Sequence, residues 1–222
     1  KSDIVYDLNG SSLKVLSVVK DLGVTVDKNL RFDNHISLVV HKSLQRGNLI
    51  LKCFQSRDRN LLMKAFKVYV RPLLEYATPV WSPHFMYLIL KIEHVQRSFT
   101  KRLFGLKNLT YIDRLKQLEI DTLEHRRLIY DLCTCFKIIH GYNDTCLVMK
   151  RTNLEGRPNN TRGHNLKLTK ELCRTDILRF YFCNRICDVW NSLPIDVVNA
   201  PSVNSFKKRV TKFNLDRFLT IK

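Results

Sequence analysis

Acidic side chains are few in this sequence, and none of them lies next to another. The 222 residues include 20 Asp and Glu, and no two acids are adjacent. Metal-assisted phosphoryl transfer needs clustered carboxylates, which hold Mg²⁺ against the attacking and leaving oxygens. The seven glycines are scattered, so there is no glycine-rich phosphate loop, and no Gly-x-Ser-x-Gly nucleophile turn occurs. The sequence therefore predicts no catalytic residues in this chain.

Long apolar runs and secretory features are also missing. No apolar run approaches the ~18 residues that a membrane-spanning helix requires, and the first residues lack the pattern of a signal peptide. The seven cysteines are an odd number, and without a secretory context we expect reduced thiols rather than disulfides. We therefore expect an intracellular protein with no membrane partner.

Positive charge is what the sequence has in excess. Lys and Arg number 38, which gives a formal net charge of +18 and a pI near 9.8. A charge of this size attracts polyanions, and neutralisation of phosphates by Lys and Arg supplies most non-specific affinity for nucleic acid. Nucleic acid is therefore the first partner to consider, and an anionic membrane surface is the rival.

The spacing of apolar residues predicts a mainly α fold with a short N-terminal β ribbon. Residues 3–26 alternate as strands around an Asn9-Gly10 turn, and such a ribbon needs something to pack on. Helical spacing begins at Asp33, which we expect to be an N-cap. The predicted helices span 33–54, 56–80 with Ser56 as cap and Pro72 as kink, 83–104, a short segment after Thr110, 121–140, 176–192 and 202–218.

These elements suggest five parts along the chain. They are the ribbon (1–32), a helical bundle (33–105), a helical extension (106–141), a loop or linker rich in turn formers (142–175) and a small helical tail (176–222). In the tail, the apolar stripe within 182–193 is expected to be core, with a docking surface as the alternative.

Two of the predicted helices carry basic residues opposite or beside their apolar stripe. In the third helix, Leu88, Ile92 and Val95 begin a stripe with helical spacing. Basic faces on adjacent helices suit contact with the phosphates of a duplex, although each could also be a solvated surface. The candidate nucleic-acid-binding residues are Lys64, Lys67, Arg71, His94, Arg97 and Lys101.

One group of cysteines has a spacing close to that of a zinc knuckle. Cys133, Cys135, His140 and Cys146 differ from the retroviral-type pattern at two of its three gaps. A knuckle needs a tight turn between its first ligands, whereas the apolar residues around Cys135 follow helical spacing. We therefore expect buried core cysteines and no metal site.

Several short strings, taken in order, resemble one family of polymerases. They are KDLGV (20–24), RPLLEYA (71–77), VWSP (80–83), IEHVQR (92–97) and WNSLP (190–194). Together they resemble the segment that follows the catalytic core in reverse transcriptases of non-LTR retrotransposons, the LINE elements of the jockey and chicken-repeat type. The strings are distributed over nearly the whole chain.

The resemblance implies a role for each part. Residues 33–105 would be the thumb, which grips the template–primer duplex, and 20–24 would belong to the last palm hairpin near the primer grip. The parent enzyme would be an RNA-directed DNA polymerase that uses Mg²⁺ and is primed at nicked target DNA, which implies a nuclear location. Its Asp-Asp palm and fingers would lie upstream and would be partners of this chain. By itself the chain, which needs no cofactor, would grip the duplex without catalysing synthesis.

Two other readings remain open from the sequence. The chain could be a stand-alone basic helical module that binds RNA or DNA, derived from a broken element. It could also be a protein-interaction domain in which the charge only confers solubility. A steep salt dependence of duplex binding would distinguish either nucleic-acid reading from the interaction domain.

Overall fold

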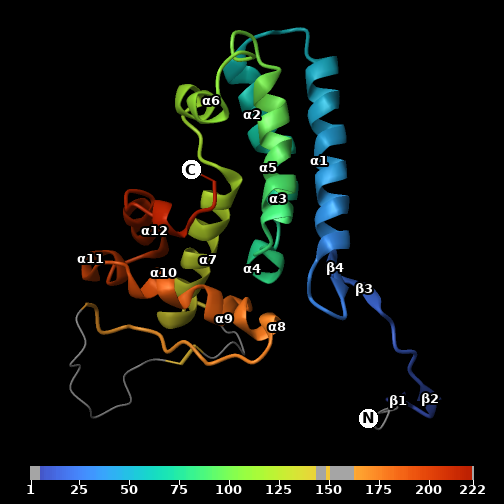
Figure 1. Ribbon diagram of the computed structural model, residues 1–222, viewed down its shortest axis with the longest axis vertical. Helices are drawn as coiled ribbons and strands as arrows, with labels where there is room; N and C mark the ends of the chain where they lie inside the picture. The colour runs from blue at the N-terminus through green and yellow to red at the C-terminus, as the bar shows by residue number, and fades with distance from the viewer. Residues whose placement is uncertain (1–5, 144–148, 151–162, 222) are drawn as a thin grey trace.

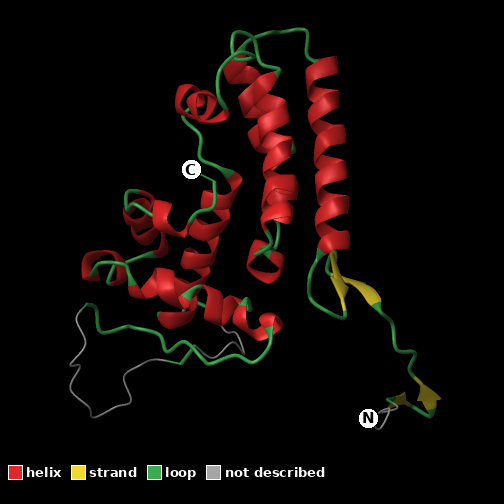
Figure 2. Ribbon diagram, in the orientation of Figure 1, coloured by secondary structure: helices red, strands yellow, loops and turns green. Residues whose placement is uncertain are grey.

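The protein is mainly helical, as the apolar spacing predicts. The computed structural model describes residues 6–143, 149–150 and 163–221. Strands are confined to the N-terminal part, and upright helices form the upper half of the molecule (Figures 1 and 2). Among the described residues, no helix is both long and apolar enough to cross a membrane.

The N-terminal ribbon consists of two short hairpins. β1 (Asp7–Leu8) and β2 (Ser11–Ser12) are antiparallel, and the turn between them has φ of 52° at Asn9 and 80° at Gly10. Positive φ at both central residues is typical of a type I′ turn, so the predicted hairpin turn is confirmed.

The second hairpin interrupts a stretch that we predicted as one alternating run. β3 (Val18–Asp21) pairs with β4 (Val24–Asp27), and Leu22 (φ 43°) and Gly23 (φ 87°) form the turn between them. Leu22 is 85% exposed. Its carbonyl accepts a 2.9 Å hydrogen bond from the Tyr76 hydroxyl, which links this turn to the helical bundle.

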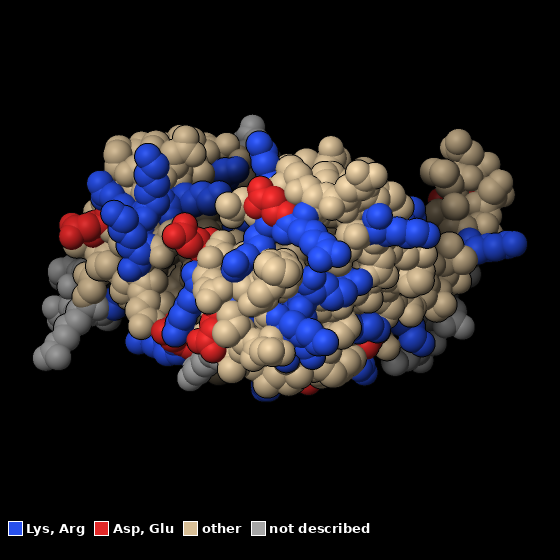
Figure 3. Space-filling view, turned by 90° about the horizontal axis from the view of Figure 1, so that it is seen from above, with Lys and Arg blue, Asp and Glu red and all other residues tan. Residues whose placement is uncertain are grey.

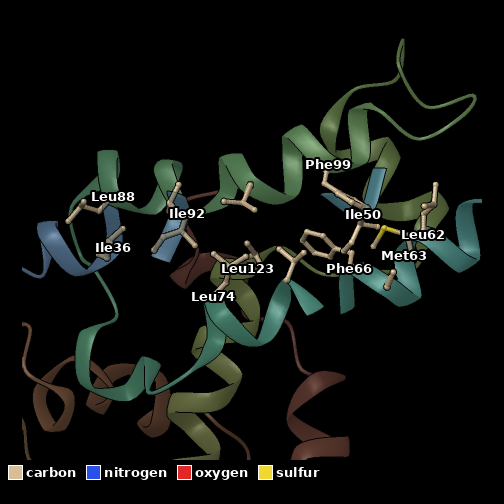
Figure 4. Close-up of a cluster of buried hydrophobic side chains, with 14 of the residues drawn as sticks. Ile36, Ile50, Leu62, Met63, Phe66, Leu74, Leu88, Ile92, Phe99 and Leu123 are labelled. Atoms are coloured by element: carbon tan, nitrogen blue, oxygen red, sulfur yellow. The ribbon is translucent and has the colours of Figure 1, made fainter. Parts of the chain in front are cut away.

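Three helical segments pack side by side to form the bundle. They are α1 (Asp33–Cys53), α2 (Arg59–Tyr69) continued by α3 (Arg71–Glu75), and α5 (Met86–Lys101). Their apolar faces meet in one buried cluster, in which the ring centroids of Phe66 and Phe99 lie 4.7 Å apart (Figure 4). Gly47 of α1 lies against Phe99, where an added Cβ would be 3.4 Å from the ring.

The first two helices begin differently from what the sequence predicted. Asp33 is the first residue of α1 rather than its N-cap, a position held by Phe32 with no side-chain cap. Asp27 instead accepts hydrogen bonds from the amides of Phe32 (2.8 Å) and Asn29 (3.0 Å), which shapes the turn before the helix. The cap of α2 is Asp58, which accepts from the Asn60 amide, and not Ser56.

The predicted helix 56–80 is divided rather than kinked. Pro72 stands in the first turn of α3, where the missing amide costs nothing, and Ala77 has a left-handed φ of 54° before α4 (Thr78–Trp81). The Trp81 indole donates a 2.7 Å hydrogen bond to the Tyr76 carbonyl. This contact is made across the break and satisfies a carbonyl that a continuous helix would have used.

The following helices connect two hydrophobic cores. Thr110 caps α6 (Tyr111–Leu118), as predicted, and Thr122 caps α7 (Leu123–Ile139). Leu123 belongs to the bundle core, whereas Ile129 to Ile139 belong to a second core. The predicted extension 106–141 is therefore shared between the two cores.

The tail packs on α7 as a set of short helices. The predicted helix 176–192 is broken into α8 (Asp176–Arg179), α9 (Phe182–Arg185) and α10 (Cys187–Asn191), and the predicted helix 202–218 is broken into α12 (Val203–Thr211) and a 3₁₀ turn (Asp216–Phe218). A further short helix, α11 (Ile195–Val198), lies between them, where a turn was predicted. The apolar stripe within 182–193 is buried, which confirms it as core. The loop region 144–148 and 151–162 lies outside the described residues.

A buried ion pair fixes the tail to α7. The Arg185 guanidinium contacts both oxygens of Asp131, at 3.0 and 3.1 Å, and also donates to the Pro79 carbonyl at 2.7 Å. Asp131 is 3% exposed. One side chain of α9 therefore joins α7 to α4, the short helix that precedes the bundle helix α5.

The bundle core makes a direct prediction for stability. Phe66→Ala removes a fully buried ring that packs on Phe99, and we expect a loss of about 3–5 kcal/mol in the free energy of unfolding. Val68→Ala on the same helix is the control, because Val68 is 54% exposed. Urea unfolding followed by circular dichroism would measure both, and equal losses would contradict this packing.

Candidate nucleic-acid interface

The six predicted binding residues do not form one surface. Lys64, Lys67 and Arg71 lie along α2 and α3, whereas His94, Arg97 and Lys101 lie on α5. The buried faces of these helices meet at Phe66 and Phe99, so their exposed faces point away from each other (Figure 4). A duplex held by one set would not lie against the other set in the same way.

Arg71 forms an ion pair with Glu75 and is only partly exposed. Its Nε lies 3.5 Å from a carboxylate oxygen of Glu75, which also binds Arg126 and the Tyr130 hydroxyl. Burial, followed by the nearby Arg126 charge, lowers the pKa of Arg71. Arg71 and Lys67 border a small polar cleft of about 150 Å³ beside Arg126. Arg71 therefore has a structural partner, which the helical pattern did not reveal.

The three candidates on α5 differ in their surroundings. The Arg97 guanidinium stacks over the Tyr111 ring at 4.8 Å, and Arg114 approaches the same ring at 5.6 Å. His94 and Lys101 are exposed and make no hydrogen bond or ion pair with any residue that the structure describes. Of the three, Lys101 stands nearest the end of the helix and joins the larger basic surface described next.

Basic residues gather where three helices reach the same end of the bundle. α1 ends there, α2 begins there and α5 ends there (Figure 1), and the view onto this end shows many Lys and Arg side chains with few acids (Figure 3). We call this surface the basic end. Its exposed members are Lys52, Arg57, Arg59, Lys101, Arg102 and Lys107.

The basic end contains residues that the helical pattern missed. Arg57 precedes α2, and Arg102 follows α5 and donates a 2.7 Å hydrogen bond to Asn48 of α1. Neither lies on a predicted basic helix face, because both lie in turns. The available signal was the local composition, since eight basic residues and one acid, Asp58, occur between Lys42 and Arg71.

The acids of the bundle do not neutralise this surface. Residues 33–105 contain twelve Lys and Arg but four acids. Asp58 caps α2, Asp33 binds Arg31 and Tyr87, Glu75 binds Arg126, and Glu93 is fully buried. Among the twelve cations, Arg71 alone forms an ion pair with a carboxylate in the part of the chain that the structure describes.

Glu93 holds the bundle and α7 together. Its carboxylate accepts hydrogen bonds from the amides of Leu123 (3.1 Å) and Glu124 (3.3 Å) at the start of α7, and from the Tyr111 hydroxyl. Burial raises the pKa of Glu93, and the Tyr111 hydroxyl, the Arg127 guanidinium and the two amides oppose this rise. The carboxylate suits this place because the first amides of a helix have no partners within the helix.

The cysteines Cys133 and Cys135 of the knuckle-like pattern lie in the second hydrophobic core. Cys133 and Cys135 are buried within α7, and His140 at its end has Nε2 3.0 Å from the Val198 carbonyl. Burial raises the pKa of both thiols. Cys146 lies outside the described residues. No cluster of three or more His, Cys, Asp or Glu in the described ranges has a geometry that could hold a metal ion.

Comparison with known proteins gives a distant relative. An uncharacterized protein of Caenorhabditis elegans is 32% identical over 126 residues, which cover 55% of this chain and 64% of that protein. The chain therefore spans less than two thirds of the length of this relative. No family model matches the chain, and no solved structure matches it.

The role of Glu93 can be tested by substitution. Glu93→Ala leaves three donors without an acceptor, so we expect a loss of about 2–4 kcal/mol in the free energy of unfolding. Glu93→Gln keeps one acceptor oxygen and should lose less. Urea unfolding would measure both, with Glu119→Gln, an exposed acid, as the control.

The pH dependence of the free energy of unfolding provides a second test of the same variants. A carboxyl whose pKa is raised by folding binds its proton more tightly in the folded state. Its contribution to stability is therefore present at low pH and is lost as the pH rises through the raised pKa. From about pH 4 to about pH 7, we expect the stability advantage of the wild type over Glu93→Gln to shrink. A growing advantage would show that the amides and Arg127 outweigh burial.

Proposed function

We propose that this chain is the thumb and tail portion of a non-LTR retrotransposon reverse transcriptase, and that it grips the template–primer duplex. The motifs RPLLEYA (71–77), VWSP (80–83) and IEHVQR (92–97) carry the resemblance. The observation that carries the binding role is the excess of cations on the bundle, where ten of the twelve Lys and Arg are exposed and the four acids are buried or already engaged. An excess of this kind favours phosphate contacts that do not depend on sequence.

The proposed grip differs from the one that the helical pattern suggested. The basic end collects cations from α1, α2 and α5 and from the turns that flank these helices, so they lie at one end of the bundle (Figure 3). Lys101, the last residue of α5, belongs to it, whereas Lys64 lies in the middle of α2. Arg71 is better explained as part of the Glu75 network. The duplex contacts are therefore assigned first to the basic end and second to the exposed face of α5.

The chemistry would reside elsewhere in the parent enzyme. Mg²⁺ bound by an Asp-Asp pair would catalyse RNA-templated DNA synthesis, and this sequence has no adjacent acids. The chain would position the duplex, and a polymerase primed at chromosomal target DNA implies a nuclear location.

The N-terminal ribbon of β1 to β4, which we call the N-terminal arm, supports the proposal of an upstream protein partner. Its large apolar side chains are exposed, among them Val15 (88%), Leu16 (64%) and Leu22 (85%). Exposed apolar clusters of this kind mark interaction sites, and the free edge of β3 could add a strand. We assign this arm to contact with the palm of the parent enzyme.

A stand-alone basic module would show the same duplex binding. The two nucleic-acid hypotheses therefore differ in whether the N-terminal arm binds a palm domain. Strong binding of a separately expressed palm to the arm would favour the polymerase reading. In a protein-interaction domain, by contrast, duplex affinity would be weak at all salt concentrations.

Salt dependence tests the assignment of the basic end. If its six cations each neutralise one phosphate, the slope of log K against log salt for B-form DNA should be roughly −5. Replacing Lys52, Arg59 and Lys101 together by Ala should flatten this slope by about 2.7 and weaken binding equally for unrelated sequences. Fluorescence anisotropy, recorded with the whole chain at several salt concentrations, would measure this slope.

The matched control removes the same charge from the tail. Arg174, Lys208 and Lys212 are exposed, and their triple replacement by Ala should change the slope much less. Equal effects of the two triple variants would mean that the charge acts diffusely and that no local interface exists.

A primer-extension assay tests the proposal that the chain alone does not catalyse DNA synthesis. The chain alone, with Mg²⁺ or Mn²⁺ and a primed RNA template, should give no product above background because no acidic pair is present to hold the metal ions. Template-dependent extension that persists through purification would contradict the proposal.

A further inference from the structure

The basic end contains a pocket lined by two phenylalanines and two arginines. It has a volume of about 450 Å³ and lies between the end of α1, the start of α2 and the end of α5. Phe54 and Phe104 line it together with Arg57 and Arg102, and the rest of its wall is formed by Leu51, Gln55, Ser56 and Leu62. No acid contributes to the lining.

Both rings are accessible to solvent. Phe104 is 67% exposed and Phe54 is 38% exposed. Phe104 has the largest exposed fraction among the exposed large apolar side chains of residues 33–105, and it lies in a cationic surface, where an accessible ring is a candidate for contact with a ligand.

The backbone holds both rings in defined positions. The Phe54 amide donates a 3.0 Å hydrogen bond to Ile50 at the end of α1. Phe104 lies between Leu103 and Leu106, whose side chains are buried and whose backbones are hydrogen-bonded. Gly105, with φ of 75°, makes the tight turn beside it. The backbone at Phe54 and on both sides of Phe104 is therefore hydrogen-bonded.

Aromatic rings beside guanidinium groups are the means by which proteins bind unpaired bases. A base stacks on the ring face, and the cations contact the neighbouring phosphates. The bases of a continuous duplex are already stacked on each other, so their faces are not available to the rings. The chemistry of the pocket thus selects single-stranded nucleic acid over duplex.

We infer that this pocket binds an unpaired base of a single strand, with Phe104 as the main stacking platform and Arg57 and Arg102 at the phosphates. The inference rests on the proposed function, since it adds a strand-specific subsite to the same basic end. In a gripped template–primer, such a subsite would hold the single-stranded part that extends beyond the duplex.

A lipid or an acidic peptide would use the same charge differently. A membrane surface would favour rings that project outward as an apolar face, whereas here they line a concave site together with two arginines. A peptide would leave the open ring faces unused unless it carried its own aromatic side chains. The base is therefore the occupant that uses all parts of the pocket.

The test uses the full chain and three probes. They are a dT oligonucleotide of about 12 nucleotides, an abasic strand with the same phosphates, and relaxed circular duplex DNA, which has no ends. Phe104→Ala is the test variant, and Tyr69→Ala is the control, because Tyr69 is an exposed aromatic (55%) at the other end of α2. Both changes are at exposed side chains, so folding should be preserved.

Phe104→Ala should weaken binding of the dT strand by roughly 5- to 150-fold, and should leave the abasic strand and the circular duplex unchanged. Phe104→Trp should retain affinity, and its indole fluorescence should be quenched by the dT strand but not by the abasic strand. This signal can be resolved because the two native tryptophans, Trp81 and Trp190, are fully buried.

The outcomes separate this inference from the proposed function. If Phe104→Ala matches Tyr69→Ala on the dT strand while the triple variant of the basic end still loses duplex affinity, the inference alone fails. If the wild type binds no nucleic acid at all, the proposed function fails and the inference fails with it. If Phe104→Ala instead reduces binding to anionic phospholipid vesicles and leaves dT binding intact, the pocket belongs to a lipid.

Discussion

The buried carboxylate of Glu93 is the constraint on which the arrangement of the two cores depends. It lies on α5, inside the bundle, yet it accepts hydrogen bonds from the first amides of α7 and from the Tyr111 hydroxyl of α6. α7 in turn carries the second core and the Asp131 carboxylate that binds Arg185 of the tail. A buried charge is tolerated when donors surround it. The orientation of the tail relative to the bundle therefore depends on acids that face inward.

The same use of acids leaves the outer surface basic. Each carboxylate that caps a helix or pairs with a buried arginine cannot neutralise an exposed lysine, and most Lys and Arg side chains among the described residues are exposed. Self-repulsion of this charge is countered by the packing of α1, α2, α3 and α5 around one apolar cluster. A stiff bundle that presents cations at one end has fixed spacing between them, which is what phosphate contacts along a strand require.

Sequence reasoning succeeded where structure is local. The helical spacing located α1, α5 and α7 within a few residues, Thr110 capped its helix as expected, and the Asn9-Gly10 turn formed. It failed where contacts between distant residues decide. The break between α3 and α4 is bridged by the hydrogen bond from Trp81 to Tyr76, and the tail is divided into short helices that pack on α7. A helical wheel gives the polar face of each helix but not the rotation of the helices relative to one another. Lys64 and His94 were therefore predicted to belong to one binding surface, but they lie on different sides of the bundle.

The site itself shows why turn residues escape a search based on periodicity. Arg57, Arg102 and Phe104 belong to no helix face, and Phe54 and Phe104 are far apart in the sequence. They come together because α1 and α5 lie side by side and end at the same level (Figure 1). A pocket of this kind has two separate sources of affinity. The cations supply attraction that depends on salt and not on base identity, whereas the rings supply stacking that requires an unpaired base. A surface with both properties can hold a duplex by its phosphates and still distinguish the position at which pairing ends.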